Sequence, residues 1–248
     1  MRVTLIQQDI AWQDAALNRR RFEASLFSAP GSDLYVLPEM WNTGFVMEPD
    51  TVAEEADGPS LQWMWRMARQ LDAALAGSIA VRIADGSFVN RLFFVTPDGV
   101  AAHYDKHHLF SYGGEDRCYT AGSQRVVVAW RGVRFLLQVC YDLRFPVWSR
   151  CRDDYDAILY VACWPSKRAL AWRTLLRARA IENQCYVVGV NRVGSDPACE
   201  YFGGTAFVNP YGEAEECPEG TETTLTGVVD LPFLQHFRDK FPVLAERD

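Results

Sequence analysis

The sequence predicts an α/β fold in which two packed mixed sheets are flanked by helices. Short apolar, strand-like runs alternate along the whole chain with segments whose apolar residues recur at helical spacing. Several strand-like runs are joined by tight turns, as in hairpins, so the sheets should be mixed rather than purely parallel. About ten to twelve strands are expected, which is more than one open sheet usually carries. A layered α/β sandwich accommodates them.

The order of the elements follows from polarity patterns and turn residues. Strand-like runs alternate in polarity or stay apolar over about four to eight residues, whereas helical segments repeat apolar residues every three or four positions. Turn residues such as GPS at 58–60, PDG at 97–99 and RG at 131–132 separate the elements. In chain order, the prediction is strand 3–8, helix 14–27, strand 33–38, helix 61–71, strands 74–81, 91–96, 125–130, 133–140 and 157–162, helix 169–184, strands 185–191, 204–209 and 224–231, and helix 232–240.

Two of these helices show their apolar face most plainly. The first places Leu17, Phe22 and Leu26 on one side, and the third does the same with Trp172 and Leu176. A helix with one apolar stripe must bury that stripe against another element. These helices are therefore expected to cover the outer faces of the sheets.

The composition suits one domain over residues 1–248 with a large core. Hydrophobic residues make up 49% of the 248 residues and charged residues 23%, and no Pro/Gly/Ser-rich linker divides the chain. The formal charge of -7 and the pI near 5.2, without a clustered Lys/Arg stripe, argue against nucleic acid or an anionic membrane as a partner. No apolar run reaches membrane-spanning length. A small molecule is the expected partner.

The cysteines indicate a reducing compartment. They number seven, an odd count, and lack the paired CxxC spacing of a zinc site, so free thiols are expected. Residues 1–9 enter a strand pattern directly and contain no secretory h-region or cleavage site. A cytoplasmic location is therefore predicted.

Cys140 is the first candidate catalytic residue. It follows the apolar run VRFLLQV at residues 133–139, and the chain then turns polar. A side chain at the carboxyl end of a buried strand can point into the crevice where α/β proteins place their sites. The thiolate is the strongest side-chain nucleophile near neutral pH when a nearby base takes its proton. The alternative is a small buried core residue, which free cysteine often is.

Three charged residues are candidates to serve Cys140. Glu39 directly follows a predicted buried strand, where partial desolvation would raise its pKa and suit it as a general base. Lys106 lies in a polar segment between apolar strands, where its ammonium would stabilise a thiolate and an oxyanion. Glu115 follows two glycines and either orients Lys106 or the substrate, or is a loop acid. Solvated surface positions are the alternative for Glu39 and Lys106 as well.

The histidines offer a rival site. His103 and His107 have the His-x3-His spacing of metal ligands on a helix, and His108 is adjacent. Their segment is predicted to be a loop, however, and no carboxylate or cysteine stands at a convincing ligand spacing. A Cys-His dyad would have to use the same residues or His236, so this interpretation is not favoured either.

Three ordered sequence blocks around the candidate residues resemble the carbon-nitrogen hydrolase, or nitrilase, superfamily over essentially the whole chain. The blocks are LPEM at residues 37–40, YDKHHLF at 104–110 and VCYDLRFP at 139–146. Within the superfamily the chain looks most like the bacterial ω-amidases, through YGGED at 112–116, RARAIENQ at 177–184 and NRVG at 191–194. The resemblance implies an α-β-β-α sandwich and a homodimer in which the sandwiches stack.

The resemblance also implies the chemistry. An ω-amidase hydrolyses the terminal amide of an α-keto acid amide such as α-ketoglutaramate or α-ketosuccinamate, without a metal or organic cofactor. Cys140 would attack, Glu39 would relay protons, Lys106 and the backbone N–H of Tyr141 would hold the oxyanion, and Glu115 would support Lys106. The same Glu-Lys-Cys chemistry also serves N-carbamoyl amino acids, aliphatic amides and nitriles. A non-catalytic binding relative is a further alternative.

Other residues are expected to shape the pocket. Arg144, four residues beyond the nucleophile, suits the carboxylate end of such a substrate, with an ion pair to Asp142 or another acid as its structural alternative. Cys163 is a departure, because relatives usually carry asparagine in Ala-Asn-Trp-Pro and the thiol is a weaker donor than a carboxamide. The expected apolar wall consists of Trp41, Phe45, Tyr112 and Trp164, with packing in the core as the alternative for these aromatic residues.

Overall fold

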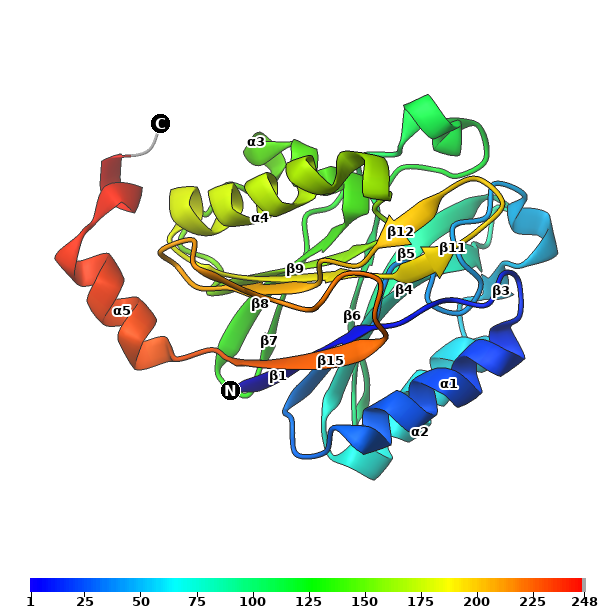
Figure 1. Cartoon of the computed structure of the whole chain (residues 1–248), viewed down its shortest axis with the longest axis horizontal. Coiled ribbons are helices and arrows are strands. Elements are labelled where there is room, and N and C mark those ends of the chain that lie inside the picture. Colours follow the sequence, from blue (N-terminus) through cyan, green and yellow to red (C-terminus); the bar gives the residue numbers. More distant parts are fainter. Residues whose placement is uncertain (247–248) are drawn as a thin grey trace.

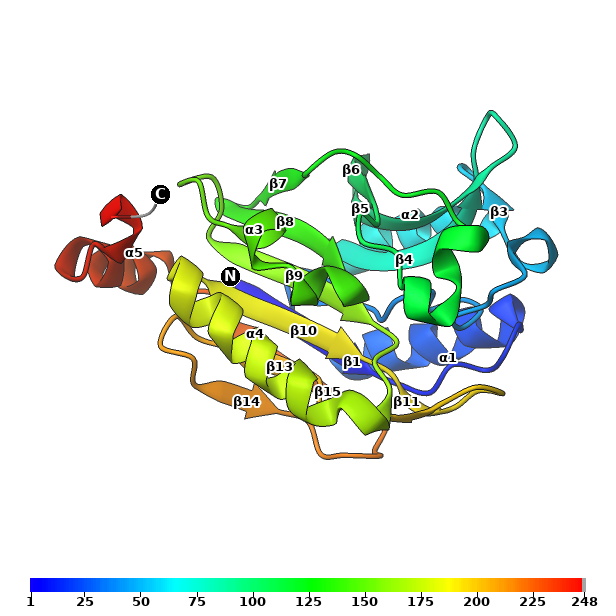
Figure 2. The same cartoon turned by 90° about the horizontal axis from the view of Figure 1, so that it is seen from above.

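The computed structural model describes residues 1–246 and has four layers (Figures 1 and 2). Two mixed sheets pack face to face in the middle. Helix α4 (Ala169–Asn183) covers the outer face of one sheet, and helices α1 (Ala15–Ser28) and α2 (Pro59–Leu71) cover the other. The predicted α/β sandwich of two packed mixed sheets flanked by helices is confirmed.

The first sheet is built mainly from the first half of the chain. Within the described residues its order is β15 (Thr223–Val228), β1 (Arg2–Gln7), β2 (Leu34–Val36), β4 (Ala74–Arg82), β5 (Phe88–Thr96) and β6 (Gly99–Asp105), with β3 (Glu54–Glu55) beside β4. Strands β1, β2 and β4 are parallel, whereas β15, β5 and β6 join as antiparallel strands. This mixture of parallel and antiparallel strands follows from the order of elements along the chain. Helices separate the parallel strands β1, β2 and β4, whereas short turns connect β4, β5 and β6.

The second sheet comes from the second half. Within residues 1–246 its order is β14 (Ala214–Glu216), β13 (Ala206–Val208), β10 (Tyr186–Asn191), β9 (Ala157–Ala162), β8 (Val133–Val139) and β7 (Val127–Trp130). Strands β8, β9 and β10 are parallel at its centre. A separate hairpin joins β11 (Val193–Ser195) to β12 (Glu200–Phe202). Short helix α3 (Pro146–Ser149) follows β8, and α5 (Leu231–Lys240) extends away from the body of the molecule (Figure 1).

The main core lies between the two sheets. Phe94 of β5 and Phe135 of β8 are both fully buried, and their ring centroids are 5.9 Å apart. Val36 and Val139, the last residues of β2 and β8, belong to the same core. Burying one such side chain contributes roughly 1.5–3 kcal/mol, so this interface fixes how the two sheets sit on each other.

The helices bury the faces that the sequence predicted. Phe22 and Leu26 of α1 are fully buried, and the Asp14 side chain caps the helix by accepting a hydrogen bond from the Leu17 N–H at 2.9 Å. Helix α2 begins at Pro59, two residues before the predicted start, since proline is well suited to a first helical turn.

Among the strands within residues 1–246, the sequence did not predict β3, β6, β11, β12 and β14. Residues 99–105 were expected to be a turn and a polar loop, but they form β6 at the edge of the first sheet. In β6 only Tyr104 is fully buried, so the strand lacks the apolar pattern on which the prediction depended. The β11–β12 hairpin was missed because each of its strands is only three residues long, which is too short to show an alternating pattern.

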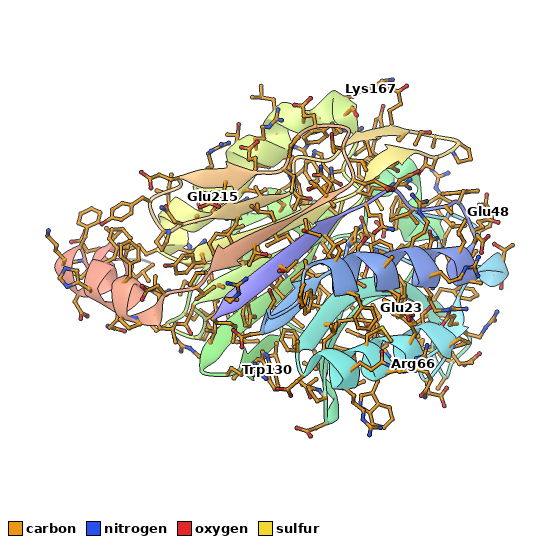
Figure 3. All side chains as sticks on the ribbon, turned by 60° about the horizontal axis from the view of Figure 1, so that its bottom comes forward. Glu23, Glu48, Arg66, Trp130, Lys167 and Glu215 are labelled. Atoms are coloured by element: carbon orange, nitrogen blue, oxygen red, sulfur yellow. The ribbon has the colours of Figure 1, made fainter. Side chains whose placement is uncertain are left out.

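The surface is charged and the thiols are unpaired. Glu48, Arg66 and Lys167 are exposed and extend from the outside of the molecule (Figure 3). The seven cysteines are all free, as expected. Across residues 1–246, no helix combines the length and apolar character needed to cross a bilayer.

Candidate active site

Three charged side chains meet in the interior beyond the ends of β2 and β6. The Lys106 Nζ lies 2.9 Å from Glu39 Oε1 and 2.8 Å from Glu115 Oε2, and all three side chains are fully buried. Lys106 directly follows β6, Glu39 lies three residues beyond β2, and Glu115 begins the 3-10 helix η3 (Glu115–Arg117). The structure thus brings together the three charged residues that the sequence singled out.

The charges of this cluster depend on one another. Burial disfavours the Lys106 ammonium, but the negative charges of Glu115 and Glu39 outweigh it and raise the pKa of Lys106 well above its ordinary value. Burial raises the pKa of Glu115, and the ammonium of Lys106 opposes that rise. The lysine is therefore a fixed cation between two carboxylates that depend on it for charge compensation.

Cys140 lies at the end of β8, at the start of the 3-10 helix η4 (Cys140–Arg144). Its φ of +44° is in the left-handed region, which is strained for a non-glycine residue and is typical of functional turns. The Glu39 carboxylate is a neighbour of its thiol. Burial raises the pKa of Cys140 well above its ordinary value, the charge of Glu39 adds to the rise and Lys106 opposes it. The resting thiol is therefore protonated at neutral pH, with a carboxylate positioned to receive its proton.

The charged cluster and the two cysteines beside it come from both sheets. Glu39 and Lys106 follow strands of the first sheet, whereas Cys140 and Cys163 follow β8 and β9 of the second. The Cys163 backbone N–H donates to Glu39 Oε2 at 2.8 Å, and its thiol donates to the Glu39 carbonyl oxygen at 3.2 Å. Glu39 is therefore held by hydrogen bonds that cross from one sheet to the other.

A glycine allows the Glu39 segment to lie close to β4. A Cβ atom on Gly77 would come within 2.9 Å of both Leu37 Cβ and Trp41 Cδ1. The backbone N–H of Met40 donates to the Ser78 hydroxyl at 3.0 Å and so fixes the same segment. The position of Glu39 therefore depends on the absence of a side chain in the neighbouring strand.

The turn that carries Cys140 is organised around Asp142, which is fully buried. Its carboxylate accepts hydrogen bonds from the Val139 N–H at 3.0 Å, the Tyr104 hydroxyl at 2.8 Å and the His108 N–H at 2.9 Å. These bonds join the end of β8 to the segment that carries Lys106. Asp142 therefore belongs to the scaffold of the turn rather than to an ion pair with Arg144.

The histidines that formed the rival metal site also support this turn. The rings of His107 and His108 stack on Trp148 and Phe145, each with centroids 3.8 Å apart. His108 Nδ1 lies 2.8 Å from Asp142 Oδ1, and His103 lies apart on β6. His107 and His108, two of the three histidines considered as metal ligands, thus contact residues that support the turn carrying Cys140.

A cavity of about 140 Å³ opens onto Cys140. Pockets for drug-sized ligands usually measure about 300 Å³ or more, so this one suits a small substrate. The predicted site residues that line it are Phe45, Lys106, Cys140, Tyr141, Arg144 and Trp164. It is further lined by Arg168 and Cys163, and by Asp196 and Tyr201 from the region of the β11–β12 hairpin.

Two predicted wall residues lie elsewhere. Trp41 is fully buried in the core beneath α2, where its ring centroid is 4.7 Å from that of Trp63. Tyr112 is 83% exposed and lies outside the cavity lining, with its ring 5.4 Å from the Arg168 guanidinium carbon. The Trp41 side chain points into the core and the Tyr112 side chain toward solvent, so neither forms the predicted apolar wall.

Asn90 is a site residue that the sequence interpretation missed. It is fully buried in β5, and its Nδ2 lies 2.8 Å from Glu39 Oε1 and 3.4 Å from Glu115 Oε1. It therefore links the two carboxylates beside Lys106. An amide within the largely apolar strand was the signal available in the sequence, because buried polar groups need partners.

Residues 2–239 match the family described as carbon-nitrogen hydrolase. The chain is 45% identical over 250 residues to Omega-amidase YafV of Escherichia coli (strain K12), covering 100% of this chain and 97% of that protein. It is 32% identical to 2-oxoglutaramate amidase of Bacillus subtilis (strain 168), covering 98% of this chain and 96% of that one.

Solved structures agree with these relatives. XC1258 from Xanthomonas campestris, described as a CN-hydrolase superfamily protein, superimposes with a TM-score of 0.97 at 43% identity, covering 100% of this chain and 97% of that chain. Nit3 of Saccharomyces cerevisiae, a nitrilase superfamily member, shares the fold with a TM-score of 0.88 at 24% identity, covering 98% and 94%. The chain therefore belongs to the carbon-nitrogen hydrolase family.

Proposed function

We propose that this protein is an ω-amidase that hydrolyses the terminal amide of α-ketoglutaramate or α-ketosuccinamate to the α-keto diacid and ammonia. The observation that carries the proposal is the buried Lys106 held between Glu39 and Glu115, beside a thiol that opens onto a small cavity. The similarity to Omega-amidase YafV and to 2-oxoglutaramate amidase supports this choice of substrate.

In the first half-reaction, Glu39 takes the thiol proton of Cys140 while the sulfur attacks the amide carbon and the carbonyl π electrons move to oxygen. The Lys106 ammonium and the backbone N–H of Tyr141 stabilise that oxyanion. Tyr141 is suited to this role because it lies in the first turn of η4, where backbone N–H groups lack partners within the helix. The tetrahedral adduct then breaks its C–N bond, and Glu39 protonates the departing nitrogen to give ammonia.

The second half-reaction uses the same groups. The acyl group is now a thioester on Cys140, and Glu39 takes a proton from the water that attacks it. The C–S bond breaks, and the sulfur recovers a proton from Glu39. Glu115 takes no part in proton transfer in this scheme. It fixes the Lys106 ammonium, to which both of its oxygens are hydrogen-bonded at 3.0 and 2.8 Å.

Arg144 is proposed to bind the carboxylate at the far end of the substrate. It lines the cavity, and its guanidinium carbon lies 5.0 Å from the centroid of the Trp164 ring. Within residues 1–246, no carboxylate lies within 4 Å of this guanidinium, so its donors are available to a ligand. A guanidinium matches a carboxylate in both shape and charge.

The substrate is tested by measuring ammonia release from a panel of amides. We expect kcat/KM for α-ketoglutaramate to exceed that for a neutral aliphatic amide by at least about 100-fold, because only the former offers an anion to Arg144. The panel also contains L-glutamine, an N-carbamoyl amino acid and an aliphatic nitrile. Preference for a carbamoyl amino acid or the nitrile would replace the proposed substrate, and no turnover of any compound would favour a non-catalytic binding relative.

A further expected result concerns Cys163. Cys163→Ala should keep kcat/KM within about threefold of wild type, because the backbone N–H that binds Glu39 Oε2 remains, and lower the free energy of unfolding by about 1–2 kcal/mol, because the Glu39 carbonyl loses its donor. Steady-state ammonia release and urea unfolding measure the two effects. Cys199→Ala, which removes another cavity-lining thiol, is the matched control. A loss of activity above about tenfold would mean that the Cys163 side chain itself aligns Glu39.

The assembly and location of the protein remain predictions. The homodimer is implied by the family resemblance, and the cytoplasmic location by the free cysteines and the N-terminal sequence. Residues 1–248 are likewise proposed to form one carbon-nitrogen hydrolase domain. The proposed chemistry uses protein groups alone, without a metal or organic cofactor.

A further inference from the structure

The cavity beside Cys140 contains a second guanidinium. Arg168 ends the 3-10 helix η5 (Ser166–Arg168), lines the same cavity as Arg144 and is half-buried. Its guanidinium carbon lies 5.1 Å from the centroid of the Phe110 ring. The sequence does not single out this residue, because it lies in a polar stretch beside a lysine and nothing in its spacing relates it to the nucleophile.

Trp164 connects the two arginines. Its ring lies 5.0 Å from the Arg144 guanidinium carbon, and its indole N–H donates to the Arg168 carbonyl oxygen at 2.9 Å. One rigid, largely buried side chain therefore fixes the backbone of one arginine and supports the guanidinium of the other. Stacking on aromatic rings leaves the edges of a guanidinium, where its N–H groups lie, free to bind a planar anion.

The surrounding acids do not neutralise these two cations. Across residues 1–246, neither Arg144 nor Arg168 has a carboxylate within 4 Å, although the Asp196 carboxylate lines the cavity. Asp196 is already engaged: its Oδ2 accepts the Tyr201 hydroxyl at 2.5 Å and lies 4.0 Å from Arg192 Nη1. Its Oδ1 accepts two backbone N–H groups of its own loop.

The charges around the cavity favour one orientation of an elongated substrate. Glu39, Glu115 and Lys106 together carry one net negative charge when all are ionised, so they repel a substrate carboxylate from the thiol. Arg144 and Arg168 attract it. An elongated molecule with an amide at one end and an anion at the other is therefore oriented with its amide toward Cys140.

We propose that Arg168 is a second anion-binding residue of the substrate site, and that Arg144 and Arg168 together select an α-keto carboxylate over an α-amino carboxylate. The inference rests on the proposed function. Two guanidiniums can donate to the carboxylate oxygens and to the neighbouring ketone oxygen, which is an acceptor. The ammonium group of an amino acid such as L-glutamine has no acceptor to offer there and is repelled by both cations.

The test measures binding and turnover separately. In a Cys140→Ala background, calorimetry should show that Arg168→Met weakens α-ketoglutaramate binding by about 10–100-fold. With Cys140 intact, Arg168→Met should raise KM for α-ketoglutaramate by a similar factor, leave kcat within about threefold, and leave kcat/KM for pentanamide unchanged. The preference for α-ketoglutaramate over L-glutamine should fall by about tenfold or more.

The controls separate recognition from folding. Lys167→Met removes the adjacent cation, whose side chain extends from the outer surface (Figure 3), and should change none of these values. Arg168→Lys keeps the charge without the planar fork and should recover part of the affinity. Unchanged binding in Arg168→Met, equal losses on α-ketoglutaramate and pentanamide, or no binding when Arg168 is present would each overturn the inference. If wild type binds α-ketoglutaramate but turns over a different amide faster, the proposed function fails and the role of Arg168 stands.

Discussion

Cys140→Ala is expected to lower kcat for amide hydrolysis by about 10⁴-fold or more while leaving the fold intact. Without the sulfur no thioester can form, and removing the nucleophile of such a catalytic group typically costs a factor of this size or larger. The side chain is only partly buried, at the wall of a cavity, and alanine keeps a Cβ at the same left-handed position. Ammonia release from α-ketoglutaramate measures the loss, and thermal unfolding should change by only a few degrees.

The chemistry of the intermediate gives this prediction a second readout. Wild-type protein quenched with acid during turnover should carry an acyl group on the peptide that contains Cys140, and Cys140→Ala should carry none. Cys163→Ala is the control, since it removes a thiol of the same cavity and should retain the adduct. Turnover by Cys140→Ala near the wild-type rate would show that another group attacks the amide.

Lys106→Met is expected to destabilise the protein by about 3–5 kcal/mol, because it leaves the carboxylates of Glu39 and Glu115 buried without their cation. For a chain of this size the corresponding fall in Tm is roughly 6 to 20 °C. The raised pKa of Lys106 means that its stabilising charge is fully present below the pKa of an unfolded lysine and is lost only as pH rises through the higher folded-state value. Urea unfolding at pH 7 measures the effect where the charge is complete.

Exposed ion pairs on the same sheet provide the comparison. Arg82 of β4 lies 3.7 Å from both Asp50 and Glu55, with its side chain 38% exposed and those of the two acids 77% and 69% exposed, so Arg82→Met should cost at most about 1 kcal/mol. Adding Glu115→Gln to Lys106→Met should restore part of the stability, because it removes one of the two stranded charges. A Lys106→Met protein as stable as wild type would contradict this account of the buried cluster.

The sequence predicted the parts of the fold that carry an apolar signal. The strands that became β8 and β9 were found because they are buried on both faces, and the strand end that carries Cys140 followed directly from them. Strand β6 could not be found in the same way, since an edge strand with exposed faces has the composition of a loop. The position of Lys106 immediately after a strand was lost for that reason, although the residue itself was identified.

The candidate site was predicted as a set of residue types rather than as a geometry. Glu39, Lys106 and Glu115 stood out because charged side chains follow or interrupt apolar runs. Asn90 and Arg168 did not, since their roles depend on contacts between segments distant in the chain. Such contacts are set by how the two sheets pack, which the pattern along a single strand does not determine.

The hydrogen bonds of Glu39 cross between the sheets. Recovery of hydrolytic activity during refolding should therefore report when the two sheets have docked. Neither sheet alone holds both the base and the nucleophile, so a refolding chain gains no activity until the two sheets have docked. Recovery of turnover then reports that docking step, whereas circular dichroism reports the formation of secondary structure. The same division constrains evolution of the core: a substitution between the sheets that shifts one against the other alters the distance from Glu39 to Cys140, however far from the cavity it lies.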